Sequence, residues 1–266
     1  MQRRVAFVLG KKPRPGTIVA EVVDLLDRDG SITCQVLLPH DQAVRAEDLQ
    51  DADLVVHRGL SGSDTDLLSC LADAQTPLCN PWAGGVQLRD RAALHDALTK
   101  ARVPTPRAVV RPTWADVLAE ERHRRVVVKA VDGPGRGQGV LPSPLPQEPP
   151  MDGPYLVEEL VEHDGTDRKL YLAGDHVSGL LKDSTLVHGH STQGRPFEVD
   201  DGLAELGRRT MAHLDLHLAG VDVVLGPEGP VVVDVNAFPG YRGVDGAAGA
   251  VAGHLLEHLA PYDQAP

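Results

Sequence analysis

The sequence predicts an α/β protein in which an N-terminal parallel α/β lobe is followed by two α+β lobes. Three observations predict this fold class. Apolar runs alternate with an amphipathic segment in the first 60 residues, short strands and helices mix in the middle, and two hairpins occupy the last third. The chain has 266 residues, which is enough for more than one hydrophobic core, because domains average roughly 150 residues.

The first 60 residues carry the pattern of a parallel sheet. Apolar runs typical of buried strands cover 4–9, 32–38 and 54–57. Residues 17–28 place apolar side chains on one face, and Thr17 stands where a helix cap is expected. Strands that alternate with helices over this length form parallel α/β units. We therefore expect an N-terminal lobe over residues 1–85.

A central lobe is predicted over residues 86–160. A helix over 88–102 should end at Val103-Pro-Thr-Pro106, because proline cannot continue a helix. The strands expected here are 108–111, 125–131 and 155–161, and a helix is expected at 113–122. Residues 141–154 are rich in proline, which predicts an extended connector.

The C-terminal lobe is predicted over residues 161–266. Its first hairpin joins 169–173 to 177–181 through Gly174-Asp175, and its second joins 220–225 to 230–235. Helices are expected at about 202–217 and 245–259.

Charge and cysteine usage exclude several classes of protein. The chain has 26 basic and 38 acidic side chains, a formal charge of −12. This balance argues against a nucleic-acid binder, which needs a basic face, but leaves room for a small anionic ligand. The three cysteines, Cys34, Cys70 and Cys79, are too few and too scattered for a disulfide framework or a zinc knuckle.

No apolar run approaches the roughly 18 residues of a membrane span. Met1 is followed by two arginines without the apolar core and cleavage site of a signal peptide. The sequence therefore predicts a cytoplasmic protein without a membrane partner.

The first candidate site is a lysine on a buried strand followed by a glycine-rich loop. Lys129 lies in Val126-Val-Val-Lys-Ala-Val131, and four glycines follow at 133, 135, 137 and 139. Glycines let backbone N–H groups approach phosphate oxygens, and the lysine adds a positive charge. A tight hairpin with an incidental lysine is the alternative. No Gly-Lys-Ser/Thr opens a helix afterwards, so the Walker pattern is absent.

The second candidate site is the last hairpin. Asp234 and Asn236 are two residues apart and therefore point to the same face of their strand. The Gly226–Gly229 turn can bring Asp222 opposite them. Two carboxylates and an amide oxygen suit Mg²⁺. The alternative is a polar outer face of the hairpin.

These motifs together resemble the ATP-grasp superfamily, and the resemblance covers nearly the whole chain. The pieces that carry it are Lys129, the glycine loop, Val157-Glu-Glu-Leu-Val161, Asp222 and Asp234-Val-Asn-Ala-Phe-Pro-Gly-Tyr-Arg-Gly243. Two branches are similar at the last motif: the ribosomal-protein glutamate ligases and the inositol tris/tetrakisphosphate kinases. The resemblance implies an N-terminal α/β lobe followed by two α+β lobes that clasp ATP.

The resemblance also implies a role for each nucleotide-facing residue. Lys129 would contact the α- and β-phosphates under a loop that contains Gly135, Gly137 and Gly139. Glu159, Leu160 and Val161 would read the adenine edge, and Glu162 would reach the ribose. Arg91 occupies the place of a first ATP-binding lysine. Asp222, Asp234 and Asn236 would hold one or two Mg²⁺ ions on the β- and γ-phosphates.

Basic residues are candidates for the acceptor side of the site. In both branches, basic residues matching Lys169 and Lys182 face the γ-phosphate and acceptor, where they compensate charge during transfer. Arg242 precedes a helix and could clamp an anionic acceptor. Solvation of strand or loop surfaces is the alternative for each. His188 and His190 stay open as acceptor-site or loop residues.

Further basic residues lie where the N-terminal strands end. These are Lys11, Lys12, Arg14 and Arg58. Ligands bind at the ends of strands in α/β sheets, so these residues could form an anionic acceptor pocket, with solvated loop charge as the alternative.

The function expected first is a Mg-ATP-dependent carboxylate–amine ligase that forms an amide through an acyl phosphate. An ATP-grasp kinase acting on an inositol phosphate or polyol is the alternative, and a non-catalytic nucleotide-binding protein is a third. The expected partners are a small anionic acceptor, either a carboxylate or a phosphorylated polyol, and an amine or peptide. A homodimer is left open.

Overall fold

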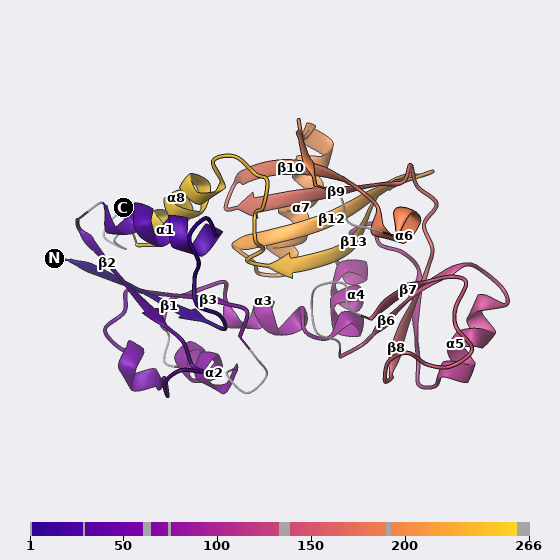
Figure 1. Ribbon diagram of the computed structural model, residues 1–266, viewed down its shortest axis with the longest axis horizontal. Helices are drawn as coiled ribbons and strands as arrows, with labels where there is room; N and C mark the ends of the chain where they lie inside the picture. The colour runs from indigo at the N-terminus through magenta and orange to yellow at the C-terminus, as the bar shows by residue number, and fades with distance from the viewer. Residues whose placement is uncertain are drawn as a thin grey trace.

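The computed structural model describes residues 2–28, 30–60, 65–73, 76–132, 139–189 and 193–259. Three β-sheets follow one another along the long axis of the molecule, with the N-terminal sheet at one end (Figure 1). Among the described residues, no helix combines the length and the apolarity that a membrane span requires.

The N-terminal lobe is built on a four-stranded parallel sheet in the order β2-β1-β3-β4. Its elements are β1 (Arg3–Leu9), α1 (Ile18–Asp27), β2 (Ile32–Leu37), the 3₁₀ helix η1 (Ala46–Leu49), β3 (Leu54–Arg58), α2 (Thr65–Asp73) and β4 (Leu78–Cys79). Alternate residues of β1 face opposite layers: Val5 and Phe7 pack against α1, and Ala6 and Val8 pack against α2. The predicted parallel lobe is therefore present.

The central lobe holds an antiparallel sheet in the order β5-β8-β6-β7. Its elements are α3 (Trp82–Gln87), α4 (Arg91–Lys100), β5 (Ala108–Arg111), α5 (Trp114–Glu121), β6 (Val126–Ala130), β7 (Val140–Pro142) and β8 (Tyr155–Glu159). Helix α5 covers one face of this sheet, where Val126, Val128 and Val157 pack against Trp114. The opposite face carries Lys129 and Glu158.

The C-terminal lobe holds an antiparallel sheet in the order β11-β10-β9-β12-β13. Its elements are β9 (Thr166–Ala173), β10 (His176–Asp183), α6 (Thr185–His188), β11 (Arg195–Phe197), α7 (Asp201–His213), β12 (Leu218–Gly226), β13 (Gly229–Ala237) and α8 (Ala247–Leu259). Helices α7 and α4 pack on one apolar face of the sheet, through Leu203 and Leu98 among others. The opposite face carries Lys169 and Asp222 and also apolar side chains such as Tyr171 and Leu218, which join the core of the N-terminal lobe.

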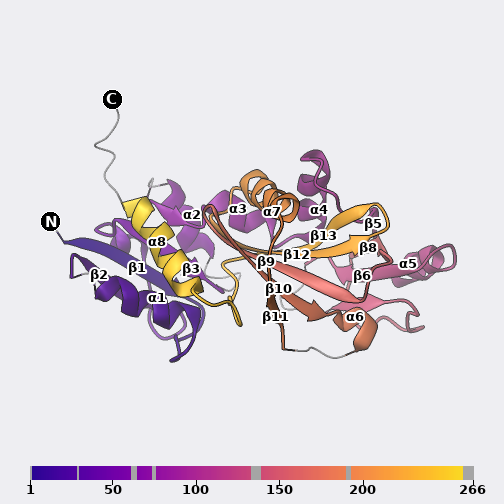
Figure 2. The same cartoon turned by 90° about the horizontal axis from the view of Figure 1, so that it is seen from above.

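Helix α8 lies away from the sheet that precedes it in the sequence. It packs beside α1 on the N-terminal lobe, where Val251 and Leu255 join the cluster of Val22 and Leu26 (Figure 2). The chain therefore returns to its first lobe after completing the third. The domain limits at residues 85 and 160 remain predictions.

Several elements differ from the sequence expectation. The helix expected at 88–102 is the shorter α4, because the Asp90 side chain accepts from the N–H groups of Ala92 and Ala93 and starts the helix there. Thr17 does precede α1, but its hydroxyl donates to the carbonyl of Arg14 and does not cap the helix. The start of the proline-rich connector is strand β7, which pairs with β6.

Candidate nucleotide and metal site

A cavity of about 380 Å³ lies between the central and C-terminal sheets. Its volume falls within the range of about 300–1,000 Å³ typical of small-molecule sites. Both lobes line it. The lining residues named by the sequence analysis are Arg91, Lys129, Glu159, Leu160, Val161, Asp222 and Asp234.

Lys129 is a buried charge that faces this cavity from β6. Its Nζ donates to the Val233 carbonyl at 2.8 Å and lies 2.7 Å from a Glu158 carboxylate oxygen. Glu158 is likewise buried, on the neighbouring strand β8. A buried charge needs such a partner, because desolvation would otherwise cost several kcal/mol. Lys129 is thus held in a fixed position between the two lobes.

A β-bulge on the last hairpin supplies one of these contacts. Asp222 pairs with Asp234, but the next residue, Val223, pairs with Val232. Val233 is therefore the extra residue of the bulge, without a partner on β12. Its carbonyl accepts from Lys129, so the bulge joins the C-terminal sheet to the central lobe at the cavity.

Three charged residues stand side by side across β9, β12 and β13. Asp222 pairs in register with Lys169 on one side and Asp234 on the other. The three side chains share one face, because cross-strand partners point the same way. Lys169 forms an ion pair with Asp222, and Asn236 Nδ2 donates to Asp234 at 3.1 Å. The predicted carboxylates are thus adjacent.

The electrostatics of this row follow from crowding and burial. Burial and the neighbouring Asp222 carboxylate raise the pKa of Asp234. Burial lowers the pKa of Lys169, but the Asp222 carboxylate outweighs this and the net shift is upward. Two carboxylates and an amide oxygen are hard donors that suit Mg²⁺. The residues present therefore fit the cation that the fold implies.

A basic cluster borders the acidic row. Lys182 lies on β10, and burial followed by the charge of Lys169 lowers its pKa, with Arg242 acting in the same direction. Arg242 is exposed in the loop after β13. Gly240 lies between Arg242 and Arg58, since a Cβ built there would be 3.7 Å from each side chain. The N-terminal lobe thus adds a guanidinium to the predicted acceptor side.

The loop that carries Arg242 is fixed by two aromatic anchors. Phe238 and Tyr241 are buried and have φ angles of +37° and +47°, which cost energy for residues other than glycine. The Tyr241 hydroxyl donates to the Leu172 carbonyl at 2.5 Å, and Arg58 Nε donates to the Phe238 carbonyl at 2.8 Å. These contacts hold the loop against the sheet and position Arg242.

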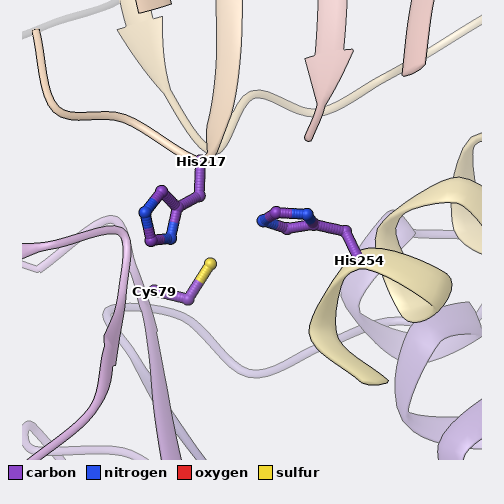
Figure 3. Close-up of side chains that lie close together, drawn as sticks. All are labelled: Cys79, His217 and His254. Atoms are coloured by element: carbon purple, nitrogen blue, oxygen red, sulfur yellow. The ribbon is translucent and has the colours of Figure 1, made fainter. Parts of the chain in front are cut away.

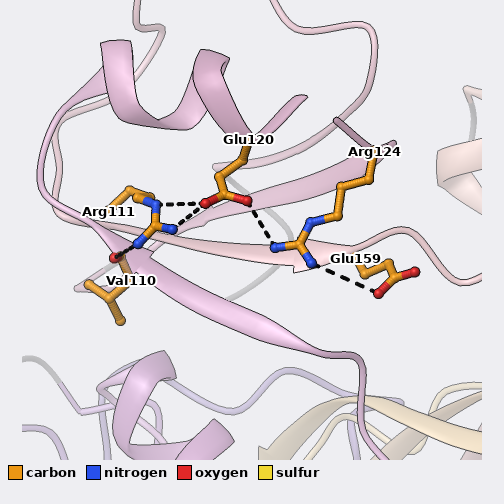
Figure 4. Close-up of polar contacts among 5 residues, drawn as sticks. All are labelled: Val110, Arg111, Glu120, Arg124 and Glu159. Atoms are coloured by element: carbon orange, nitrogen blue, oxygen red, sulfur yellow. Dashed lines mark hydrogen bonds and ion pairs between the residues drawn. The ribbon is translucent and has the colours of Figure 1, made fainter. Parts of the chain in front are cut away.

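The far end of the cavity is bordered by the end of β8. Glu159, Leu160 and Val161 line it there. A chain of alternating charges runs from Arg111 through Glu120 and Arg124 to Glu159 (Figure 4). The N–H of Leu160 already donates to the Arg125 carbonyl at 3.0 Å. The Leu160 N–H is therefore already engaged within the protein.

The structure places the remaining predicted residues as follows. Arg91, at the start of α4, donates to the Ala130 carbonyl at 2.8 Å and lines the cavity. Glu162 is exposed and is not among the described residues that line the cavity. Gly139 has a φ of +76° just before β7, and Gly135, Gly137 and His190 lie outside the described residues. His188 ends α6, within 3.4 Å of a Cβ built at Gly165.

Sequence reasoning missed several groups at the cavity. The sequence analysis named Glu159 and not its neighbour Glu158. Glu158 pairs with Val127 on β6, and Lys129 is two residues from Val127. Side chains two residues apart on a strand share a face, so this pairing would have placed Glu158 beside the lysine. Asp167, His163 and Thr185 also line the cavity. No signal in the sequence marks the Val233 carbonyl, because a bulge depends on the pairing of two strands.

Comparison with known proteins supports the same fold. No protein-family model matches the chain. A protein of Xanthomonas oryzae pv. oryzae described as a "Probable alpha-L-glutamate ligase" is 30% identical over 116 residues, which cover 40% of this chain and 38% of that relative. The chain therefore spans about two fifths of the length of such curated relatives.

Two solved structures match over nearly their whole length. A RimK domain protein ATP-grasp from Sphaerobacter thermophilus is 23% identical, with a TM-score of 0.75 over 95% of this chain and 99% of that one. The ATP-grasp ligase PsnB, complexed with a precursor variant, Mg and ADP, is 17% identical, with a TM-score of 0.71 over 98% and 99%. The chain therefore has the ATP-grasp fold of these two proteins.

Proposed function

We propose that this protein is an ATP-dependent carboxylate–amine ligase that activates its acceptor as an acyl phosphate. The observation that carries the proposal is the row of Lys169, Asp222 and Asp234, which stand in register across three strands. Asp222 and Asp234 of this row line the cavity between the two lobes. The glutamate-ligase description of the curated relatives favours a ligase over a kinase.

Each part of the cavity receives a role in this proposal. Adenine lies against Glu159, Leu160 and Val161, and the phosphates extend toward Lys129 and Arg91. Lys129 suits this role because contacts with Glu158 and with the Val233 carbonyl already hold its Nζ at the cavity. Glu162 faces solvent, so a ribose contact would require movement of its side chain.

The metal position is Asp222, Asp234 and Asn236. Mg²⁺ there would neutralise charge on the β- and γ-phosphates. Asp222 is paired with Lys169 in this structure, so a cation bound by Asp222 would weaken that ion pair. Lys169 would then be released toward the transferring phosphoryl group, which provides a direct coupling between metal binding and phosphate stabilisation.

The reaction has two steps in this proposal. A carboxylate oxygen of the acceptor attacks the γ-phosphorus of ATP, the bond to the bridging oxygen breaks, and ADP leaves. An amine nitrogen then attacks the carbonyl carbon, phosphate leaves, the nitrogen loses a proton and an amide remains. Lys169, Lys182 and Arg242 offset the negative charge of the γ-phosphoryl group and the acceptor.

The acceptor is an anion that reaches the cavity from the N-terminal lobe. Arg58 and Arg242 both approach Gly240, and two guanidinium groups suit bidentate recognition of a carboxylate. A solved ATP-grasp ligase, PsnB, binds a precursor peptide. A peptide or amino-acid carboxylate is therefore the acceptor class we propose.

The test measures phosphate and ADP release while acids and amines are supplied separately and together. A ligase releases both products in equal amounts only when an acid and an amine are present. With an ¹⁸O-labelled carboxylate, one labelled oxygen should appear in the released phosphate, because the acyl phosphate carries it.

Two other results would replace this proposal. ADP release with a stable phosphorylated acceptor and no free phosphate would show a kinase. Nucleotide binding without any turnover across the full set of acids and amines would leave a non-catalytic binding protein.

A further inference from the structure

A second polar cluster lies where the N-terminal and C-terminal lobes meet. Cys79 comes from β4, His217 from the residue before β12, and His254 from α8 (Figure 3). One ligand atom of each, the Sγ and two imidazole nitrogens, lies within 4.8 Å of the others. None of the three lines the nucleotide cavity.

Three of the four imidazole nitrogens of His217 and His254 are buried without a hydrogen bond to any described residue. The His254 residue is 8% exposed, and within the described part of the chain neither of its nitrogens has a hydrogen-bond partner. His217 Nδ1 is also buried and unpartnered. The Glu257 carboxylate approaches His254 Nδ1 only to 3.7 Å and is largely exposed. Buried polar atoms are normally satisfied, so these nitrogens require an explanation.

The backbone around the cluster is tightly arranged. The Asn80 side chain accepts from the N–H groups of His217 and Leu218 at 2.7 Å and donates to the Leu218 carbonyl at 2.9 Å. This fixes β12 against the residue that follows Cys79. Gly174, with a φ of +54°, faces the His254 ring so closely that a Cβ there would be 2.5 Å from Nδ1. The three side chains therefore come from elements that the fold holds in place.

The protonation states of the two histidines suit ligation. Burial, with the neighbouring His258 and His217, lowers the pKa of His254 to about 4. Burial and His258 lower the pKa of His217. Both rings are therefore neutral at pH 7, the form in which imidazole binds metals.

We propose that Cys79, His217 and His254 form a binding site for a Zn²⁺-type cation that joins the N-terminal lobe to the C-terminal lobe. A thiolate and two imidazoles are the ligand types that zinc takes, whereas Mg²⁺ prefers oxygen. In a tetrahedral zinc site, bond lengths of about 2.0–2.3 Å place ligand atoms about 3.3–3.6 Å apart. The ligand atoms need to close by no more than about 1.5 Å.

In this proposal water takes the fourth coordination position. His258 lies beside both imidazoles, with ring centroids 4.5 Å from His217 and 4.3 Å from His254. Its Nδ1 is engaged with the His254 carbonyl at 3.0 Å, which helps fix the orientation of the α8 backbone. When the cation binds, the Cys79 thiol loses its proton to solvent, and the thiolate sulfur donates a lone pair to the metal.

The test uses the full-length protein after treatment with a chelator, titrated with Co²⁺ and then with Zn²⁺. Co²⁺ should bind one equivalent with a thiolate-to-metal charge-transfer band and the visible bands of tetrahedral cobalt. Zn²⁺ should displace it and raise the midpoint of thermal unfolding. Absence of both the charge-transfer band and the stabilisation in the wild-type protein would overturn the proposal without any variant.

Variants assign the ligands. Cys79→Ser should remove the charge-transfer band, and His254→Gln should lower Zn²⁺ affinity by more than about 100-fold, since loss of even an outer partner of a ligand costs 10–100-fold. Cys70→Ser and His213→Ala are matched controls at exposed positions and should bind as the wild type does.

A separate variant distinguishes this site from the nucleotide site. Asp234→Asn should keep the charge-transfer band, because Asp234 belongs to the other cluster. A band that survives Cys79→Ser, or one that Asp234→Asn removes, would contradict the assignment.

Discussion

One polar cluster includes Asp222 of β12 and the other includes His217, the residue before that strand, and the two clusters differ in how their charges are compensated. Near Asp222, two lysines are ion-paired within the protein: Lys169 pairs with Asp222, and Lys129 with Glu158. Just before the strand, His217 adjoins Cys79 and His254, and all three side chains are neutral. His217 Nδ1 and both nitrogens of His254 are buried without a hydrogen bond to any described residue. The first cluster holds full charges and the second holds none.

This difference indicates two kinds of ligand. A charged, internally paired site suits exchange, in which an incoming cation or phosphate replaces an existing ion pair at little net electrostatic cost. A neutral, unpaired site suits a ligand that supplies its own charge and stays bound. The first is expected at a site of turnover, and the second at a structural junction.

The largest effect is expected from a substitution that disrupts the charged cluster. Asp234→Asn should lower ATP turnover by at least about 1,000-fold, because it removes a carboxylate from the proposed Mg²⁺ position. Steady-state phosphate release measures this. Asp215→Asn is the control, since Asp215 is an exposed residue with a φ of +51° that asparagine tolerates. Wild-type turnover in Asp234→Asn would remove the metal assignment.

The next effect tests the internal pairing itself. Lys129→Met should destabilise the protein by about 3 kcal/mol, because it leaves the Glu158 carboxylate buried and unpaired. Chemical denaturation measures the change, and Lys100→Met at an exposed position serves as the control.

Adding Glu158→Gln to Lys129→Met should recover part of that stability. The recovery distinguishes an unpaired charge from lost packing, because the packing defect remains in the double variant. A double variant no more stable than Lys129→Met would show that the ion pair is not the cause.

A smaller effect tests how closely the neutral cluster is packed. Gly174→Ala should lower the free energy of unfolding by about 2 kcal/mol. The added Cβ would collide with the His254 ring, and alanine is also strained at a positive φ. Gly16→Ala shares the positive φ of +74° but has nothing within 4 Å of the added Cβ, and should cost about 1 kcal/mol. Equal losses in thermal unfolding would mean that the ring is not closely packed against residue 174.

The smallest expected effect concerns the charge chain behind the cavity. Hydrogen bonds and charge from Arg111, with Arg124, lower the pKa of Glu120 from its ordinary value of 4.5. Because the folded value lies below the unfolded one, the stabilisation is present above about pH 4.5 and is lost as the pH falls through the folded pKa.

Glu120→Gln should therefore lower the free energy of unfolding by about 1 kcal/mol at pH 7. This difference in stability from the wild type should shrink below pH 4. Unfolding midpoints between pH 3 and 7 measure it. A difference that stays constant over this range would exclude ionisation of Glu120 as its source.

The sequence predicted the sheets well and the cross-lobe contacts poorly. Apolar runs such as 126–128 and the turn at 226–229 mark strands locally, and they placed Lys129, Asp222 and Asp234 on strands. Short elements such as β4 and α6 carry too few residues for a periodic signal. The packing of α8 on α1 depends on contacts between residues more than 200 positions apart, which no local pattern encodes.

The cysteine count shows the same limit. Three scattered cysteines predicted no zinc knuckle, and spacing along the chain supports that expectation. Cys79 nevertheless meets His217 and His254 because three elements from two lobes converge. A ligand set assembled from distant positions leaves no motif.

The central claim is that Asp222, Asp234 and Asn236 hold Mg²⁺ against a nucleotide in the cavity beside Lys129. Calorimetric titration of the wild type and of an Asp222→Asn/Asp234→Asn variant with ADP, with and without Mg²⁺, tests it most directly. The account predicts that Mg²⁺ tightens ADP binding in the wild type and has no effect in the variant. Failure of the wild type to bind ADP, or an equal effect of Mg²⁺ in both proteins, would contradict it.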